Sequence, residues 1–201
     1  MSDAGRPYYF FEKAMMTMKK DLGSTLALYP TPLVLVGAMV DGKPNWVLAG
    51  HVGIMGHDHI MVSLSQAHYT NRGIREHGKL SVHVVDESML AKADHAGCVS
   101  GAKEDKSTLF PYSITPEGVP VTDQAKLLMV CAVEDNYVTP GFDNFILKIL
   151  HTDADEAILT PKGKIDYDGF KPVLFEMPGY TYLRTGETIA RCMSLNGQSS
   201  K

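Results

Sequence analysis

The chain has 201 residues and a mass of 22.0 kDa, enough for one domain with a full hydrophobic core. Its formal net charge is −4 and its 19 Lys and Arg residues are scattered, which disfavours nucleic acid as the main partner. No apolar run is long enough for a membrane span or the core of a signal peptide, and Cys98, Cys131 and Cys192 form no C-x-x-C pair. These features predict a single domain over residues 1–201, in the cytoplasm and without a membrane partner.

Two strand-like runs near the N-terminus predict a β-hairpin. Residues 31–40 and 45–52 are apolar and rich in β-branched side chains, and Asp-Gly-Lys at 41–43 lies between them. An Asp-Gly pair between two such runs is a strong hairpin signal. Ala49 and Gly50 are small where a strand normally carries bulk. Glycine there marks either a close ligand or an ordinary bend of a barrel.

The stretch 59–78 reads as a strand with hydroxyl side chains at its end, followed by a helix that a Thr70-Asn71 pair opens. The first N–H groups of a helix are unpaired and lie at the positive end of its dipole, so this junction is suited to an anion such as the phosphate of a cofactor. The alternative is that the hydroxyls only cap the helix. The segment alone favours the cap.

The remaining elements alternate strands with a few helices. Helices are expected over 8–20 and 86–94, strands over 80–85, 125–133 and 143–151, a loop over 97–106, a turn near 139–141, and short strands at 173–176 and 180–183. The two long runs read as antiparallel neighbours. Many strands and few helices predict a mainly β protein, a barrel with covering helices.

Few motifs of known chemistry are present. His57-Asp58-His59 places two imidazoles on one side of a strand, but no third ligand lies nearby, so a polar turn is favoured over a metal site. The chain lacks G-x-S-x-G, G-x-G-x-x-G and the P-loop pattern, which argues against a serine hydrolase and the common nucleotide folds. No catalytic acid or base is assigned.

Several residues allow two interpretations. Lys103 and Lys106 follow the glycines at 97 and 101 and either neutralise a phosphate or are only solvated. Trp46, the single tryptophan, and Tyr69 either face a planar ligand or pack in the core.

Four ordered segments together resemble the flavin reductase-like FMN-binding split barrels, and within them the flavoredoxin branch. The first segment is Tyr-Pro-Thr-Pro-Leu-Val-Leu-Val-Gly from 29 with the following Asp-Gly-Lys-Pro-Asn-Trp, and the second is Met-Val-Ser-Leu-Ser from 61 with Tyr-Thr at 69–70 and Gly-Ile at 73–74. The third is Lys-Ala-Asp from 92 with Gly97 and the Ser100 to Lys106 loop, and the fourth is the long strand pair. The similarity covers roughly residues 29–152.

The resemblance implies a six-stranded antiparallel split barrel of Greek-key type, a homodimer, and one noncovalent FMN per subunit. It implies an FMN-dependent oxidoreductase that moves electrons or hydride from NAD(P)H, or from a small-molecule or protein redox partner. The alternatives are an electron carrier without NAD(P)H activity, or a flavin-less dimeric binding module. The implied flavin contacts are Asn45, Trp46, Ala49, Gly50, Ser63, Leu64, Ser65, Tyr69, Thr70, Ser100, Lys103 and Lys106.

The sequence departs from its relatives in two places. Gln66-Ala67-His68 stands where relatives carry basic residues before Tyr-Thr, and Leu147-Lys148 stands where they often carry Gly-Glu. Neutralisation of a phosphate is therefore expected to depend more on Lys103, Lys106 or Arg72.

Overall fold

The computed structural model describes residues 19–195. The helix expected over 8–20 falls outside this range apart from its last two residues. None of the helices within the described part is long and apolar enough to cross a membrane.

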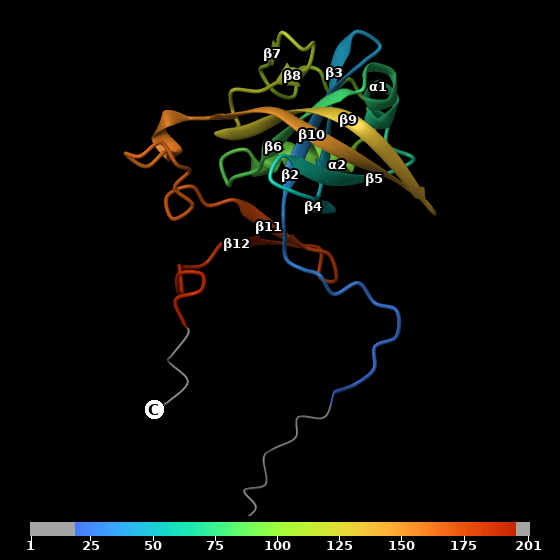
Figure 1. Ribbon diagram of the computed structural model, residues 1–201. Helices are drawn as coiled ribbons and strands as arrows, with labels where there is room; N and C mark the ends of the chain where they lie inside the picture. The colour runs from blue at the N-terminus through green and yellow to red at the C-terminus, as the bar shows by residue number, and fades with distance from the viewer. Residues whose placement is uncertain (1–18, 196–201) are drawn as a thin grey trace, which may run out of the picture.

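A curled antiparallel sheet of seven strands forms the body of the molecule (Figure 1). Its spatial order is β3-β2-β6-β9-β10-β5-β4, and every neighbouring pair runs antiparallel. The strands are β2 (Val34–Val40), β3 (Lys43–Ala49), β4 (Val52–Ile54), β5 (His59–Ser65), β6 (Lys79–Val84), β9 (Leu127–Thr139) and β10 (Phe142–Ala154). The mainly β split-barrel fold predicted from the sequence is confirmed.

The hairpin turn between β2 and β3 follows the local chemistry. Asp41 and Gly42 both have positive φ angles, 49° and 75°, as a two-residue turn that matches the twist of its strands requires. Met39 then pairs with Pro44 and Val40 with Lys43. The predicted hairpin is therefore present at the predicted place.

The strand count differs from the expected six because the run 45–52 makes two strands. β3 ends at Ala49 and pairs with β2, whereas β4 begins at Val52 and pairs with β5. The chain bends at Gly50, where an added Cβ would lie 2.5 Å from the Phe175 ring, and the Gly50 carbonyl accepts the Thr31 hydroxyl at 2.6 Å. The small residue thus serves a bend of the barrel.

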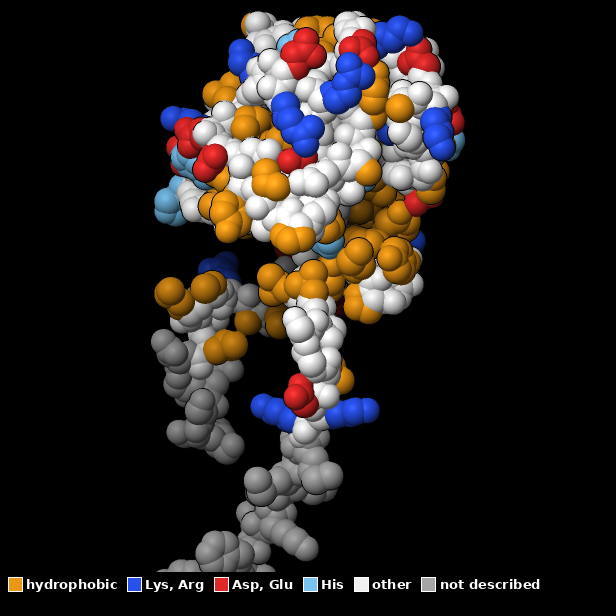
Figure 2. All heavy atoms as spheres, turned by 90° about the vertical axis from the view of Figure 1, so that its right-hand side faces the viewer, with side chains coloured by type: hydrophobic (Ala, Val, Ile, Leu, Met, Phe, Trp, Pro, Cys, Tyr) orange, Lys and Arg blue, Asp and Glu red, His pale blue; other side chains and the backbone are white. Residues whose placement is uncertain are grey.

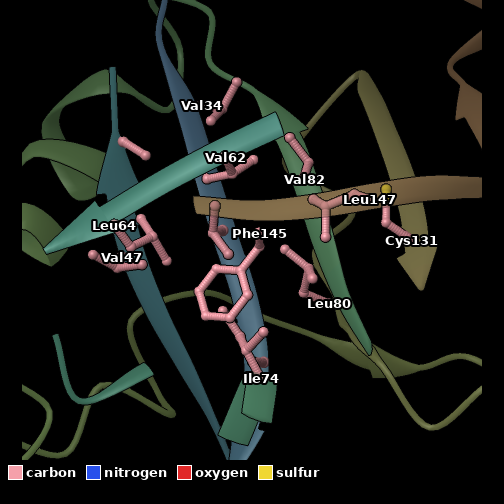
Figure 3. Close-up of a cluster of buried hydrophobic side chains, with 13 residues drawn as sticks. Val34, Val47, Val62, Leu64, Ile74, Leu80, Val82, Cys131, Phe145 and Leu147 are labelled. Carbon is pink, nitrogen blue, oxygen red and sulfur yellow. The ribbon is translucent and has the colours of Figure 1, made fainter. Parts of the chain in front are cut away.

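One hydrophobic core fills the curl of the sheet (Figure 3). It combines side chains from six strands of the sheet with Ile74 of α1 (Thr70–His77), and Phe145 of β10 lies near its centre. Ile74 is fully buried, so α1 lies against one end of the barrel. Burying that many aliphatic side chains is the main stabilising term of the fold.

A second core lies on the other face of β2 and β3, under α2 (Leu90–Cys98). Trp46 is completely buried here, with its ring 5.6 Å from both Phe110 and His83. The helix expected over 86–94 begins only at Leu90, because the Asp86 carboxylate accepts the Ser88 N–H at 2.9 Å and pairs with Lys126 at 2.8 Å. The acidic stretch makes a turn before the helix.

The C-terminal part forms a smaller sheet below the barrel (Figure 1). β11 (Val173–Glu176) lies between β1 (Thr31–Pro32) and β12 (Thr181–Arg184), which confirms the strands expected at 173–176 and 180–183. The remaining elements are β7 (Ser113–Ile114), β8 (Pro120–Val121) and the 3₁₀ turn η1 (Glu156–Ile158).

Candidate functional site

The start of α1 is not capped by its own side chains, contrary to the expectation from Thr70-Asn71. The capping position is Tyr69, whose side chain makes no cap bond, and Thr70 and Asn71 lie inside the first turn and are buried. Asn45 donates from Nδ2 to Thr70 Oγ1 at 2.6 Å. Among residues 19–195 no acceptor is bonded to the backbone N–H groups of Tyr69 and Thr70. These donors remain available to an anion.

A buried carboxylate holds α1 on the barrel. Asp143 of β10 is 1% exposed and accepts Asn71 Nδ2 at 2.7 Å and Asn136 Nδ2 at 3.1 Å, and it also pairs with Arg75. Asn71 Nδ2 also donates to the Ser65 carbonyl at 3.0 Å. A buried charge needs such partners, so this network fixes the end of β5 relative to the first turn of α1.

Two adjoining hollows lie beside that first turn. The larger, of about 330 Å³, extends from the β2–β3 turn to the loop 101–106, and the smaller, of about 200 Å³, lies between residues 67–70 and the segment 97–101. Tyr69, Gly101 and Lys106 line both. The two hollows together form the candidate site.

Gly101 allows the loop to close onto the barrel. A Cβ at this position would lie 2.0 Å from Asn45 Oδ1 and 2.8 Å from Tyr69 Cδ1. No side chain fits there, so the loop backbone approaches Asn45 and Tyr69 directly. The glycine therefore shapes the wall that the two hollows share.

Charged residues around the larger hollow are mostly paired. Lys43 Nζ lies 2.6 Å from Asp105 Oδ2, and the Lys43 ammonium holds the pKa of that carboxyl well below its usual range. Arg72 pairs with Asp41 at 3.1 Å, and Asp41 also accepts the Tyr69 hydroxyl at 2.6 Å. Lys103 lines the hollow and has no ion-pair partner within the described residues. Among the described residues, Lys103 is thus an exposed cation beside the larger hollow without an ion pair, whereas Arg72 is already paired with Asp41.

Lys106 has a structural task as well as a place in the site. Its side chain is buried, and Nζ donates to the carbonyls of Ala96 at 2.9 Å and Val99 at 3.0 Å, which end α2. A cation at a helix C-terminus satisfies carbonyls that have no partner in the helix. Burial lowers the pKa of Lys106 to about 8. One of its three N–H donors remains for a ligand.

The structure brings half of the predicted flavin contacts together and places the others elsewhere. Those that line the hollows are Asn45, Tyr69, Thr70, Ser100, Lys103 and Lys106. Trp46, Ala49 and Leu64 are buried in the two cores, and Gly50 lies against Phe175. Ser63 donates to Asn144, and Ser65 Oγ accepts the Ala67 N–H at 3.4 Å.

Some lining residues were not predicted as part of a site. Gly101 and His68 line the smaller hollow, and Asp41 and Lys43 line the larger. In the sequence, Asp41 and Lys43 indicate a hairpin turn, and His68 stands in a segment where relatives carry basic residues. Asp41 and Lys43 precede Asn45, and His68 precedes Tyr69, so their closeness to predicted site residues is the signal in the sequence that could have identified them.

Of the two histidines at 57 and 59, His57 lies in a polar turn and His59 begins β5. His59 bonds to Asp58 Oδ1 at 2.7 Å and to Glu134 Oε2 at 2.9 Å. Within residues 19–195, no three side chains of the types that hold metals gather in one place. The described cysteines are free thiols, with Cys131 buried and Cys98 and Cys192 exposed.

Solved structures share this architecture over most of their length. The flavoredoxin from Methanosarcina acetivorans aligns with a TM-score of 0.85 and 29% identity over 90% of this chain and 99% of that one. The flavoredoxin of Desulfovibrio vulgaris (Miyazaki F) aligns with a TM-score of 0.81 and 31% identity over 88% and 98%. The sequence model of the "flavin reductase like domain" matches residues 26–181. The chain belongs to the flavin reductase-like family.

The fold is also shared by a protein of lower sequence identity. An FMN-binding protein from Thermus thermophilus, solved with bound 1-cyclohex-2-enone, aligns with a TM-score of 0.73 at 21% identity, over 88% of this chain and all of that one. At this identity the likeness concerns the fold. The family match begins before β1 and ends at the first residue of β12, so it includes every residue that lines the two hollows.

Proposed function

We propose that the protein binds FMN noncovalently and works as an oxidoreductase that takes hydride or electrons from NAD(P)H. Membership of the flavin reductase-like family supports a redox role, and its flavoredoxin relatives support a flavin. The observation that carries the proposal is the convergence of Asn45, Thr70, Lys103 and Lys106 on one site. The Thr70 hydroxyl, the Lys103 ammonium and the remaining N–H of Lys106 are donors that a phosphate group can use.

The residues of the site fit the phosphate of FMN. The free N–H groups of Tyr69 and Thr70, the Ser100 hydroxyl and the Lys103 ammonium are donors that a phosphate accepts. Gly101 removes the side chain that would otherwise fill the wall between the hollows. Bound FMN supplies one- and two-electron redox chemistry, and the protein supplies binding and orientation.

Purified protein incubated with FMN and desalted is expected to be yellow and to quench flavin fluorescence. We expect Lys103→Ala to raise the Kd for FMN about fivefold, since an ion pair at a half-open site is worth about 1 kcal/mol. Lys162→Ala, an exposed lysine outside both hollows, is the charge-matched control and should leave the Kd unchanged. Lys106→Ala is unsuitable because it also removes the cap of α2.

Failure to retain any flavin would contradict the proposal and favour a flavin-less binding module. With flavin bound, rapid bleaching by NADH or NADPH in stopped flow supports the reductase. Bleaching by neither would leave an electron carrier that exchanges electrons with a partner protein. We further propose that the protein acts in the cytoplasm and exchanges electrons with a small-molecule or protein redox partner.

We also propose that the protein forms a homodimer through its apolar lower end. Figure 2 shows hydrophobic side chains gathered at this end of the barrel, near the departing 19–30 segment. A hollow of about 580 Å³ there is lined by Val34, Val52, Ile60, Met129 and other mainly apolar residues. Leu22, Leu26 and Leu28 in the 19–30 segment are 56–80% exposed, and a second copy can bury such side chains.

Ile54 at the edge of that hollow is 87% exposed and reports on the interface. Light scattering should give twice 22.0 kDa for the wild type and a shift toward 22.0 kDa for Ile54→Glu. A monomeric wild type would contradict the dimer.

A further inference from the structure

The smaller hollow contains two nitrogen bases and no carboxylate. His68, from the turn that precedes α1, and Lys106, from the loop 101–106, both line it. α2 contributes Cys98, the start of α1 contributes Tyr69, and β3 contributes the apolar Val47. Glu104 acts on Lys106 through its charge, but it lines the other hollow and pairs with His95 at 2.9 Å. No carboxylate that lines the smaller hollow therefore neutralises a positive charge there.

The His68 ring is held in this hollow with one unused nitrogen. Its Nδ1 atom is inaccessible to solvent and has no hydrogen-bond partner among residues 19–195, while its backbone N–H donates to the Ser65 carbonyl at 2.9 Å. Burial lowers the pKa of His68, and the Lys106 charge lowers it further. A buried polar atom without a partner is costly, so a ligand group that enters the hollow and hydrogen-bonds this nitrogen would relieve that cost.

We propose that His68 and Lys106 together bind the phosphate of the flavin, and that His68 takes up a proton as the phosphate binds. The inference rests on the proposed function and adds a control by pH to it. A dianion between the two bases supplies the missing counter-charge and favours their protonated forms. Once protonated, His68 supplies the positive charge that relatives carry in the basic residues before Tyr-Thr.

The sign of the pH dependence follows from linkage. Binding raises the pKa of His68 above its low value in the free protein, so its contribution is complete at acidic pH and is lost as the pH rises through the bound-state pKa. Lys106, with a free pKa of about 8, loses its contribution at higher pH in the same direction. The phosphate itself becomes a dianion above about pH 6. Affinity is therefore expected to be highest slightly above pH 6 and to fall on the alkaline side.

The test is the Kd for FMN between pH 6.5 and 7.5, from quenching of flavin fluorescence. For the wild type we expect the Kd for FMN to rise with pH, by up to about tenfold per pH unit where binding takes up a full proton. His68→Gln should bind more weakly at pH 6.5 and show a flat profile. His68→Arg carries a permanent charge and should bind well with a flat profile. Riboflavin, which lacks the phosphate, should bind all three proteins without this pH dependence.

Calorimetry gives a second readout that does not depend on activity. Titration of FMN at pH 7 in two buffers of different ionisation enthalpy should show proton uptake by the wild type and none by His68→Arg. Binding of FMN with a flat wild-type profile, or a His68→Gln profile identical to that of the wild type, would overturn the inference and leave the proposed function standing. Absence of FMN binding at every pH would overturn both. Thermal unfolding of each variant verifies that it is folded.

Discussion

Replacement of Gly73 by alanine is expected to lower the free energy of unfolding by about 3 kcal/mol or more. Gly73 lies in α1 where the helix crosses β2, and an added Cβ would lie 1.8 Å from the Met39 carbonyl oxygen and 2.8 Å from its carbon. Both are backbone atoms of a central strand and cannot move aside. Helix propensity alone favours alanine over glycine by about 1 kcal/mol, so steric overlap must outweigh a local gain.

The neighbouring residue explains why α1 cannot simply move outward. Ile74 is fully buried in the core of the barrel, and a displaced helix would withdraw it. Chemical denaturation of Gly73→Ala should therefore show a clearly lower midpoint. Gly186→Ala is the matched control, since Gly186 is exposed and an added Cβ would have no neighbouring atom within 4 Å. We expect the control within about 0.5 kcal/mol of the wild type, and equal stability of Gly73→Ala would contradict this account of the packing.

Elements with strong local signals were predictable from the sequence. The turn at Asp41-Gly42 follows from residues that accept positive φ, and the long strands β9 and β10 follow from their apolar runs. β11 has the predicted bounds, 173–176. In each case the determining interactions lie within or next to the element. The sequence carries such information in a short window.

Features that depend on distant residues were not predictable in this way. Thr70 and Asn71 have the composition of a helix cap, but Asn45 and Asp143 engage their side chains inside the first turn. The bend at Gly50 that adds a strand depends on Phe175, far along the chain. The positions of Trp46 in the core and of Lys106 at the end of α2 are likewise properties of the folded chain.

Stability is expected to fall by about 2.5 kcal/mol between pH 7 and pH 4.5 through one buried histidine, His83. Its ring is fully buried against Trp46, Nδ1–H donates to the Leu35 carbonyl at 3.0 Å, and Nε2 accepts the Thr122 N–H at 3.2 Å. This arrangement requires the neutral ring. Burial lowers the pKa of His83 to about 4 from an ordinary value of 6.5.

The direction follows from proton binding. Between pH 6.5 and about 4 the unfolded chain holds a proton on this ring and the folded chain does not, so acidification favours unfolding over that window. Urea denaturation at pH 7.0 and 4.5 measures the effect.

His83→Asn keeps a donor and an acceptor without a charge, so it should lose less stability over this interval than the wild type. His57→Asn, in an exposed turn, should follow the wild type. Parallel pH profiles for His83→Asn and the wild type would contradict this account and show that acid sensitivity arises in carboxylate pairs such as Asp86 with Lys126. Burial raises the pKa of Asp86, but Lys126 and Ser88 together hold it below its usual value, so this pair also weakens in acid.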